Sequence, residues 1–286
     1  MADDEPMLAA DVPVLPAATV MLVRDGDDGI EVFMLQRTMS ASFARGQYVF
    51  PGGRVDAADH GEEFEPVCDG LDDATASARM AMDHGGLAWL VAAIRECFEE
   101  AGVLLARAVD EADVVRFDDP TTADRFNDAR HAIHDGRQTL VELCERERLL
   151  LLTDRMHLVD HWVTPVGERK RFDTRFFVAQ APGAQEPLHD DKETIASLWV
   201  RPADALSMWQ AGDLQMFPPT VASIRFLQRF DTAAAVVDAA NEMDVPRAIT
   251  PRMLFGDDGG IVGVRLPWQD GYESTPLPEF VIGRRR

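Results

Sequence analysis

Three glutamates, Glu96, Glu99 and Glu100, lie within five positions of one another in the stretch IRECFEEAG at residues 94–102. In a helix, residues three and four apart share one face with Cβ atoms roughly 5–6 Å apart, so these like charges repel one another. Mg²⁺ and Mn²⁺ prefer hard oxygen ligands, and a bound cation would remove the repulsion. The spacing therefore indicates a divalent-metal site. The alternative is the solvated acidic face of an amphipathic helix.

The apolar residues of the same region predict the helix that carries these glutamates. They recur at i, i+4, i+7, i+8 and i+11 and form one stripe: Leu90, Ile94, Cys97, Phe98 and Ala101. The helix is expected over residues 87–101, because Gly102 stands where a helix commonly ends. On such a helix the glutamates point away from the apolar core.

A second polar stretch, PGGRVDAADH at residues 51–60, opens on a glycine turn and carries two aspartates, Asp56 and Asp59. Arg95, directly before Glu96, can pair with this loop or with a glutamate and hold the geometry of the cluster. Together the two stretches resemble the signature of the Nudix hydrolases, G-x5-E-x7-R-E-U-x-E-E-x-G-U, in which U is a bulky apolar residue. The second half is matched by residues 95–103, and the first half by Gly53 and by Asp59, where the family usually has Glu.

The two halves of this signature are separated by a long insertion. Residues 60–94 comprise 35 positions where the signature has seven, so about 28 residues are inserted. The interruption resembles a Nudix branch that cleaves coenzyme A (CoA) and acyl-CoA. This branch also carries the motifs FPGG, RE-x-FEEAG, WVTP followed by RFDTRFF, and a PPT helix start, all of which are present. The resemblance covers roughly residues 15–232.

The resemblance implies hydrolysis of the diphosphate of CoA or acyl-CoA, giving 3′,5′-ADP and (acyl-)4′-phosphopantetheine. An alternative is a Nudix diphosphatase for NADH, ADP-ribose or a nucleotide sugar. A third reading is a Nudix fold that only senses a nucleotide. The complete set of Arg95, Glu96, Glu99 and Glu100 argues against the sensor.

The resemblance also implies roles for particular residues. Glu96, Glu99 and Glu100 would hold Mg²⁺ or Mn²⁺, and the Gly52 carbonyl would add a ligand. A further carboxylate, as ligand or general base, is expected from the stretch HDDKETIASLWV. Glu193 is the candidate, and Asp190 and Asp191 are alternates; the competing interpretation is a solvated acidic loop.

Substrate contacts are expected from basic residues. Arg169, Lys170 and Arg171 form a basic run in an acidic protein and could meet the 3′-phosphate of CoA, whereas an ordinary exposed turn is the competing interpretation. Arg54, beside the glycine turn, is a candidate for contact with the diphosphate.

The overall composition limits the partners. The 286-residue chain has a formal net charge of −22 and a sequence pI near 4.6, so it should repel nucleic acid and anionic membranes. A small phosphorylated substrate remains compatible if metal ions neutralise the site. The three cysteines have no CxxC spacing, and no apolar run reaches membrane-helix length, so we expect reduced thiols and a cytoplasmic protein. A homodimer is left open.

The remaining elements indicate an α/β (or α+β) fold. Strands are expected at residues 17–25, 30–38, 103–105, 157–165, 171–182 and 195–202, and helices at 121–136, 139–152, 202–212 and 219–230. Because tight βαβ alternation is absent, we expect a mixed sheet, and the resemblance implies the Nudix α/β/α sandwich. We expect a flexible acidic tail over residues 1–14, a Nudix domain over 15–232 and a C-terminal extension over 233–286 with a β-hairpin. Within the domain, the box insertion is expected over about 60–86 and a helical elaboration over about 106–160.

Overall fold

A mixed β-sheet forms the centre of the molecule. The computed structural model describes residues 6–38, 46–187 and 194–284. The strand order is β11–β3–β2–β10–β9, with β4 beside β3 and β5 beside β2. Within this sheet β2 and β10 are parallel and the other pairs are antiparallel, which confirms the mixed sheet. The strands are β2 (Val14–Gly26), β3 (Gly29–Arg37), β4 (Tyr48–Val49), β5 (Gly52–Arg54), β9 (His157–Val163), β10 (Arg171–Gln180) and β11 (Thr194–Val200).

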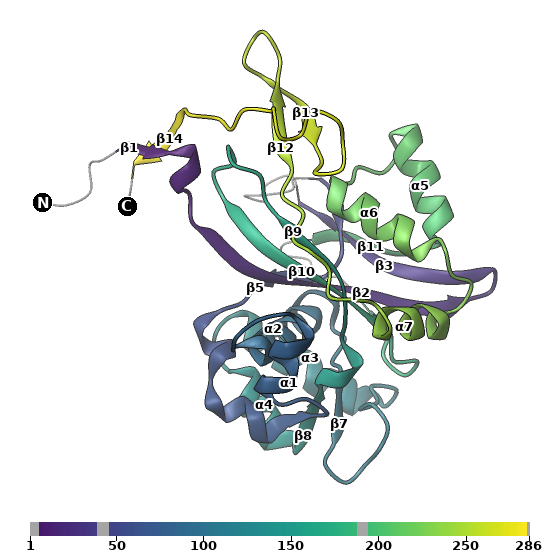
Figure 1. The fold of residues 1–286 in the computed structure, drawn as a ribbon. Coiled ribbons are helices and arrows are strands. Elements are labelled where there is room, and N and C mark those ends of the chain that lie inside the picture. The colour runs from purple at the N-terminus through teal and green to yellow at the C-terminus, as the bar shows by residue number, and fades with distance from the viewer. Residues whose placement is uncertain (1–5, 39–45, 188–193, 285–286) are drawn as a thin grey trace, which may run out of the picture.

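Helices cover both faces of this sheet, as Figure 1 shows. On one side of the sheet lie α1 (Asp73–Arg79), α2 (Gly86–Ala101), α3 (Pro120–His134) and α4 (Leu140–Glu147), of which α2 packs directly against the strands; on the other side lie α5 (Pro202–Ala211), α6 (Pro218–Leu227) and α7 (Ala233–Asn241). Alternation along β2 supplies both cores, because Val20 and Leu22 face the α2 side whereas Met21 and Val23 face the α7 side. The expected α/β/α sandwich is confirmed.

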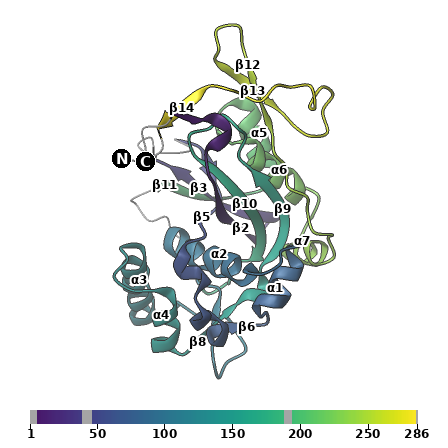
Figure 2. The same cartoon turned by 60° about the vertical axis from the view of Figure 1, so that its left-hand side comes forward.

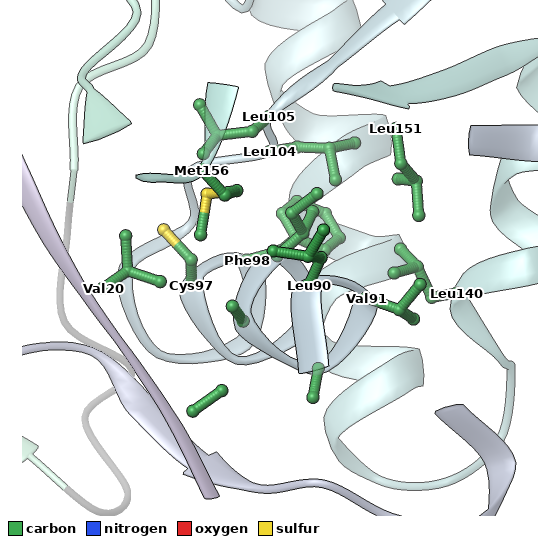
Figure 3. Packing of buried hydrophobic residues seen from close by; sticks show 14 of the residues in the cluster. Val20, Leu90, Val91, Cys97, Phe98, Leu104, Leu105, Leu140, Leu151 and Met156 are labelled. Carbon is green, nitrogen blue, oxygen red and sulfur yellow. The ribbon is translucent and has the colours of Figure 1, made fainter. Parts of the chain in front are cut away.

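The predicted carboxylate helix is α2. Its apolar stripe is buried. In the hydrophobic cluster that Figure 3 shows, Cys97 and Phe98 pack together with residues that follow α2 in the chain. The helix ends at Gly102, which has φ of +70° and donates its N–H to the Phe98 carbonyl at 2.9 Å. Only a residue without Cβ adopts this conformation at little cost, so the stop signal in the sequence has a direct structural cause.

The insertion between the two halves of the signature is ordered and lies against α2. The 3₁₀ turn Ala57–His60 leads into it from the first half of the signature, and the insertion itself contains a second 3₁₀ turn (Glu62–Val67), strand β6 (Cys68–Asp69) and helix α1. Asp73 of α1 accepts from the N–H groups of Gly85 and Leu87 at 3.0 Å each. The insertion therefore supplies hydrogen-bond acceptors to the start of the carboxylate helix.

Two local predictions in the following region are wrong. Residues 103–105 are buried coil before β7 (Ala106–Ala108), not a strand. Residues 149–152 were expected to continue a helix but form strand β8 (Leu149–Leu152), which pairs with β6 and β7. Helix α4 stops because Arg148 adopts a left-handed conformation with φ of +53°. A run of four leucines carries no periodicity that separates helix from strand.

Segments near the two ends of the chain, β1 (Pro6–Leu8) and β14 (Val281–Arg284), lie side by side, as Figure 2 shows. Strand β1 pairs with β14, and Ala9 and Val12 are buried, so the described part of the expected loose tail is anchored. The expected C-terminal hairpin is β12 (Arg252–Phe255) with β13 (Ile261–Arg265). Helix α7 belongs to the core on its face of the sheet. Among the described residues, no helix combines the length and apolar character needed to cross a membrane.

Candidate active site

Arg95 joins the two halves of the split signature. Its Nε and Nη2 donate to Oδ1 and Oδ2 of Asp59, at 2.9 Å each, and Nη2 also donates to the Arg54 carbonyl at 2.8 Å. Asp59 is buried, and its Oδ2 also accepts from the Asp56 N–H at 2.8 Å. Asp59 therefore occupies the place that the signature gives to Glu, and the insertion leaves the contact between the halves intact.

The same guanidinium also contacts two of the three glutamates. Nη1 of Arg95 lies 2.8 Å from Oε1 of Glu96 and 3.1 Å from Oε1 of Glu99. Burial raises the pKa of Glu96 to about 7, and the charge of Glu99 adds to this rise while Arg95 opposes it. Burial alone would lower the pKa of Arg95, but the hydrogen bond to Asp59 and the surrounding carboxylates raise it overall. Arg95 is therefore a fixed cation that partly offsets the repulsion between the glutamates.

The glycine turn lies directly against the carboxylates. A Cβ on Gly53 would stand 2.5 Å from the carboxylate of Glu96, and one on Gly52 would stand 2.5 Å from the Ala18 carbonyl oxygen. The Gly52 N–H donates to Oε2 of Glu100 at 2.9 Å. At Gly52 the sheet backbone leaves no room for a side chain, whereas at Gly53 a side chain would displace the carboxylate of Glu96.

The burial of Glu100 differs from the expectation. The glutamates do leave the apolar stripe, but Glu100 is only 5% exposed, and the side chains of Glu96 and Glu99 are 14% and 12% exposed. The glycine turn covers them. These residues are thus not a solvated acidic face, and the repulsion between them is stronger than it would be in water.

Three residues around α2 were missed by the sequence analysis. Arg130 of α3 donates from Nε to the Glu99 carbonyl at 2.8 Å and from Nη2 to the Glu100 carbonyl at 2.9 Å. Nδ1 of His134, one turn further along α3, lies 3.6 Å from Oε2 of Glu99. Arg37 of β3 lies 3.7 Å from Oε1 of Glu100. The only sequence signal was that basic residues stabilise helix C-termini, which does not identify a residue on another helix.

The donor set fits a hard divalent cation. Mg²⁺ and Mn²⁺ prefer oxygen ligands, which the three carboxylates and the carbonyl groups of the nearby glycine turn can supply. A bound cation would also remove the repulsion between the carboxylates. In the described part of the chain, no three acidic, histidine or cysteine side chains already converge on one point as a metal site. Since Arg95 Nη1 bridges Glu96 and Glu99, binding of an ion requires rotation of these carboxylates about their side-chain bonds.

The basic residues that were predicted to contact the substrate do not lie together in the structure. The Arg54 side chain is exposed, and its Nη2 lies 3.9 Å from Oδ1 of Asp56. Arg169 and Lys170 are exposed in the turn between β9 and β10, whereas Arg171 is buried and donates to the Thr164 carbonyl at 3.1 Å. Arg171 pairs with β2 four residues away from the Ala18–Gly53 pair, roughly 13 Å along the strand. Glu193, Asp190 and Asp191 lie outside the described residues.

Comparisons with known proteins agree with this geometry. The NUDT19 Nudix domain family matches residues 7–227. Proteins named acyl-coenzyme A diphosphatase NUDT19 are 23% identical over 86% of this chain in Xenopus laevis, 27% over 66% in Gallus gallus and 26% over 71% in Homo sapiens. The chain spans 72%, 58% and 62% of the lengths of these relatives, respectively. A crystal structure of a Nudix hydrolase from Alicyclobacillus acidocaldarius is 26% identical, with a TM-score of 0.64, covering 79% of this chain and 96% of its own.

Proposed function

Because the chain belongs to the NUDT19 Nudix domain family, we propose that it is a metal-dependent diphosphatase of CoA or acyl-CoA. The observation that carries the proposal is the contact of Arg95 with Asp59, Glu96 and Glu99, which closes the interrupted signature around a carboxylate cluster. The printed names of three relatives support CoA esters as the substrate class.

The residue roles follow from the chemistry of diphosphate cleavage. Water attacks one phosphorus, the bridging oxygen leaves with the other phosphate, and negative charge grows on the phosphoryl oxygens. Mg²⁺ or Mn²⁺, held by Glu96, Glu99, Glu100 and the Gly52 carbonyl, would supply positive charge for these oxygens. Arg95 keeps the carboxylates oriented, and Arg54 is the candidate for contact with the diphosphate. Glu193 remains the candidate general base.

The products of this reaction are 3′,5′-ADP and 4′-phosphopantetheine, or the acyl form of the latter. The thioester survives because the three cysteines provide no activated nucleophile: Cys97 and Cys144 are buried, and burial raises the pKa of Cys68 to about 12. A Nudix diphosphatase for NADH, ADP-ribose or a nucleotide sugar is the second candidate, since the carboxylate cluster is equally suited to any nucleoside diphosphate.

A substrate panel tests the proposal. CoA, an acyl-CoA, NADH, ADP-ribose and a nucleotide sugar are incubated with Mg²⁺, with Mn²⁺ or with a chelator, in water enriched in ¹⁸O, and products are identified by mass spectrometry. We expect metal-dependent cleavage of CoA compounds with ¹⁸O in one phosphate product. Preferred cleavage of another diphosphate would favour the second candidate, and release of free fatty acid would refute the reaction class.

A further inference from the structure

Arg175 of β10 is a buried cation with no hydrogen bond in the described part of the chain. The residue is 7% exposed, and its Nε and Nη1 are enclosed with no hydrogen-bond partner among the described residues. Of the carboxylate oxygens in that part of the chain, Oδ1 of Asp173 pairs with it, 3.8 Å from Nη1, which is too long for a hydrogen bond. Buried polar groups in folded proteins are nearly always satisfied, so this guanidinium requires a specific explanation.

The neighbours of Arg175 leave its charge largely uncompensated. The guanidinium carbon lies 4.0 Å from the centre of the Trp89 ring, which fixes the side chain in place. Asp173 is hydrogen-bonded to Nε2 of His161. The side chain of Asp173 is 34% exposed, so this cluster reaches the surface. An arginine held on an aromatic ring beside an occupied carboxylate is suited to receive an anion.

The register of the sheet places Arg175 close to the candidate active site. Ala18 of β2 pairs with Gly53 of β5 on one side and with Arg175 of β10 on the other. Since neighbouring strands are about 4.8 Å apart, Arg175 and Gly53 are roughly 10 Å apart on the same face of the sheet. Gly53 is the residue that contacts the carboxylate of Glu96.

Helix α2 confirms this placement independently. Trp89 precedes Glu96 by seven residues, which is two helical turns and about 10.5 Å along the axis on one helix face. The end of α2 with Glu96 lies over β5, and the beginning with Trp89 lies over β10. The helix therefore links the carboxylate cluster and Arg175 along one interface between α2 and the sheet.

We propose that Arg175 binds a phosphate group of the substrate that is separate from the hydrolysed diphosphate. For CoA this group is the 3′-phosphate, and in this form the inference rests on the proposed function. Arg175 is then a specificity residue for substrates with a second phosphate. It replaces the basic run of Arg169, Lys170 and Arg171 in this role, because that run lies before and at the start of β10, away from the Ala18–Gly53 pair, and its buried member already donates to the Thr164 carbonyl.

Hydrolysis of CoA and dephospho-CoA by wild type and Arg175→Gln tests the proposal. We expect kcat/KM for CoA to fall at least tenfold and that for dephospho-CoA to change less than threefold. Arg175→Lys keeps the charge and should retain part of the preference. Arg24→Gln is the matched control, because Arg24 also lies 4.0 Å from a tryptophan ring, that of Trp199, but has Glu31 as a hydrogen-bond partner at 2.8 Å. Equal losses for both substrates, or no loss, would overturn the proposal.

A binding experiment separates this inference from the proposed reaction. Calorimetry compares 3′,5′-ADP with 5′-AMP, which differ only in the 3′-phosphate, and thermal unfolding confirms that each variant is folded. We expect wild type to bind 3′,5′-ADP at least tenfold more tightly and Arg175→Gln to lose the difference. If wild type does not distinguish the ligands, the inference fails whatever the enzyme hydrolyses. If wild type does not cleave CoA but Arg175 still discriminates, only the proposed function fails.

Discussion

Asp59 and Arg95 are 36 positions apart in the chain and are joined by two hydrogen bonds of 2.9 Å. The intervening residues form their own turns and helix, so the insertion adds structure without separating the two halves. Lengthening a loop costs little, since each doubling adds only about 0.6 kcal/mol of closure entropy. The charge-assisted pair therefore helps to hold the glycine turn against the carboxylate helix, together with the hydrogen bond from the Gly52 N–H to Glu100.

Asp59→Asn should weaken this junction. Hydrogen bonds to charged groups contribute about 1.5–3 kcal/mol. In the variant, the asparagine side chain is neutral, and its NH₂ group cannot accept a hydrogen bond from Arg95. We expect a loss of about 2 kcal/mol or more in the free energy of unfolding and lower kcat. Urea unfolding measures the stability and steady-state kinetics measure kcat. Asp59→Glu introduces the residue that is usual in the family and should retain most of the activity. Wild-type behaviour of Asp59→Asn would contradict the junction.

Glu100→Gln should separate chemistry from folding. The amide oxygen can still accept from the Gly52 N–H, while the lost charge relieves repulsion among the carboxylates. We expect kcat to fall by about 10²-fold or more, equivalent to about 2.7 kcal/mol, with unfolding changed by less than about 1 kcal/mol. Glu100→Ala also removes the contact with the turn and should destabilise the fold. Full activity of Glu100→Gln would refute the metal assignment.

Arg130→Ala tests whether α3 holds the end of the carboxylate helix. Removal leaves the carbonyls of Glu99 and Glu100 without their charged donors, and each such bond contributes about 1.5–3 kcal/mol. We expect lower stability and weaker Mg²⁺ binding, measured by urea unfolding and calorimetric titration. Arg125→Ala, an exposed arginine on the same helix that lies 3.3 Å from Glu147, is the control and should change neither quantity appreciably.

Asp73→Ala tests the contribution of the insertion to the start of α2. Asp73 accepts from two N–H groups at this end of the helix, and loss of such a capping acceptor typically costs about 1 kcal/mol. We expect that loss in urea unfolding, with kcat changed less than threefold because the carboxylates lie at the other end. Asp83→Ala, exposed in the same connection, should have no effect. A stability equal to wild type would show that the insertion does not support the helix.

The cysteines should react slowly with thiol reagents in the native protein. Burial raises the pKa of Cys68 and of Cys144 to about 12 and that of Cys97 further. Because a raised pKa keeps a thiol protonated until the pH approaches it, only about one part in 10⁴ is thiolate at pH 8. A chromogenic disulfide reagent should titrate three thiols rapidly in denaturant and less than one within minutes in buffer. Rapid reaction of a thiol in the native protein would show that the buried cysteines become accessible to the reagent.

Local patterns in the sequence were sufficient to predict the carboxylate helix and the glycine turn that form the candidate site. The spacing of Glu96, Glu99 and Glu100, the glycine turn and the stop at Gly102 each depend on neighbouring positions in one element, so periodicity and backbone geometry reveal them directly. The substitution of Asp59 for Glu was also readable, because the resemblance specifies its distance from Gly53. The mixed sheet followed from strands that alternate irregularly with helices.

The tertiary structure decided which distant residues join these elements. Arg130 and Asp73 act on α2 from other helices, and Arg175 reaches the same face through the pairing of three strands. Their partners are backbone groups or aromatic faces, for which no sequence spacing is required. The burial of Glu100 and the strand formed by Leu149–Leu152 likewise depend on what packs against them. A sequence determines what a local segment prefers, whereas the charge environment of a side chain is set only when separate elements pack together.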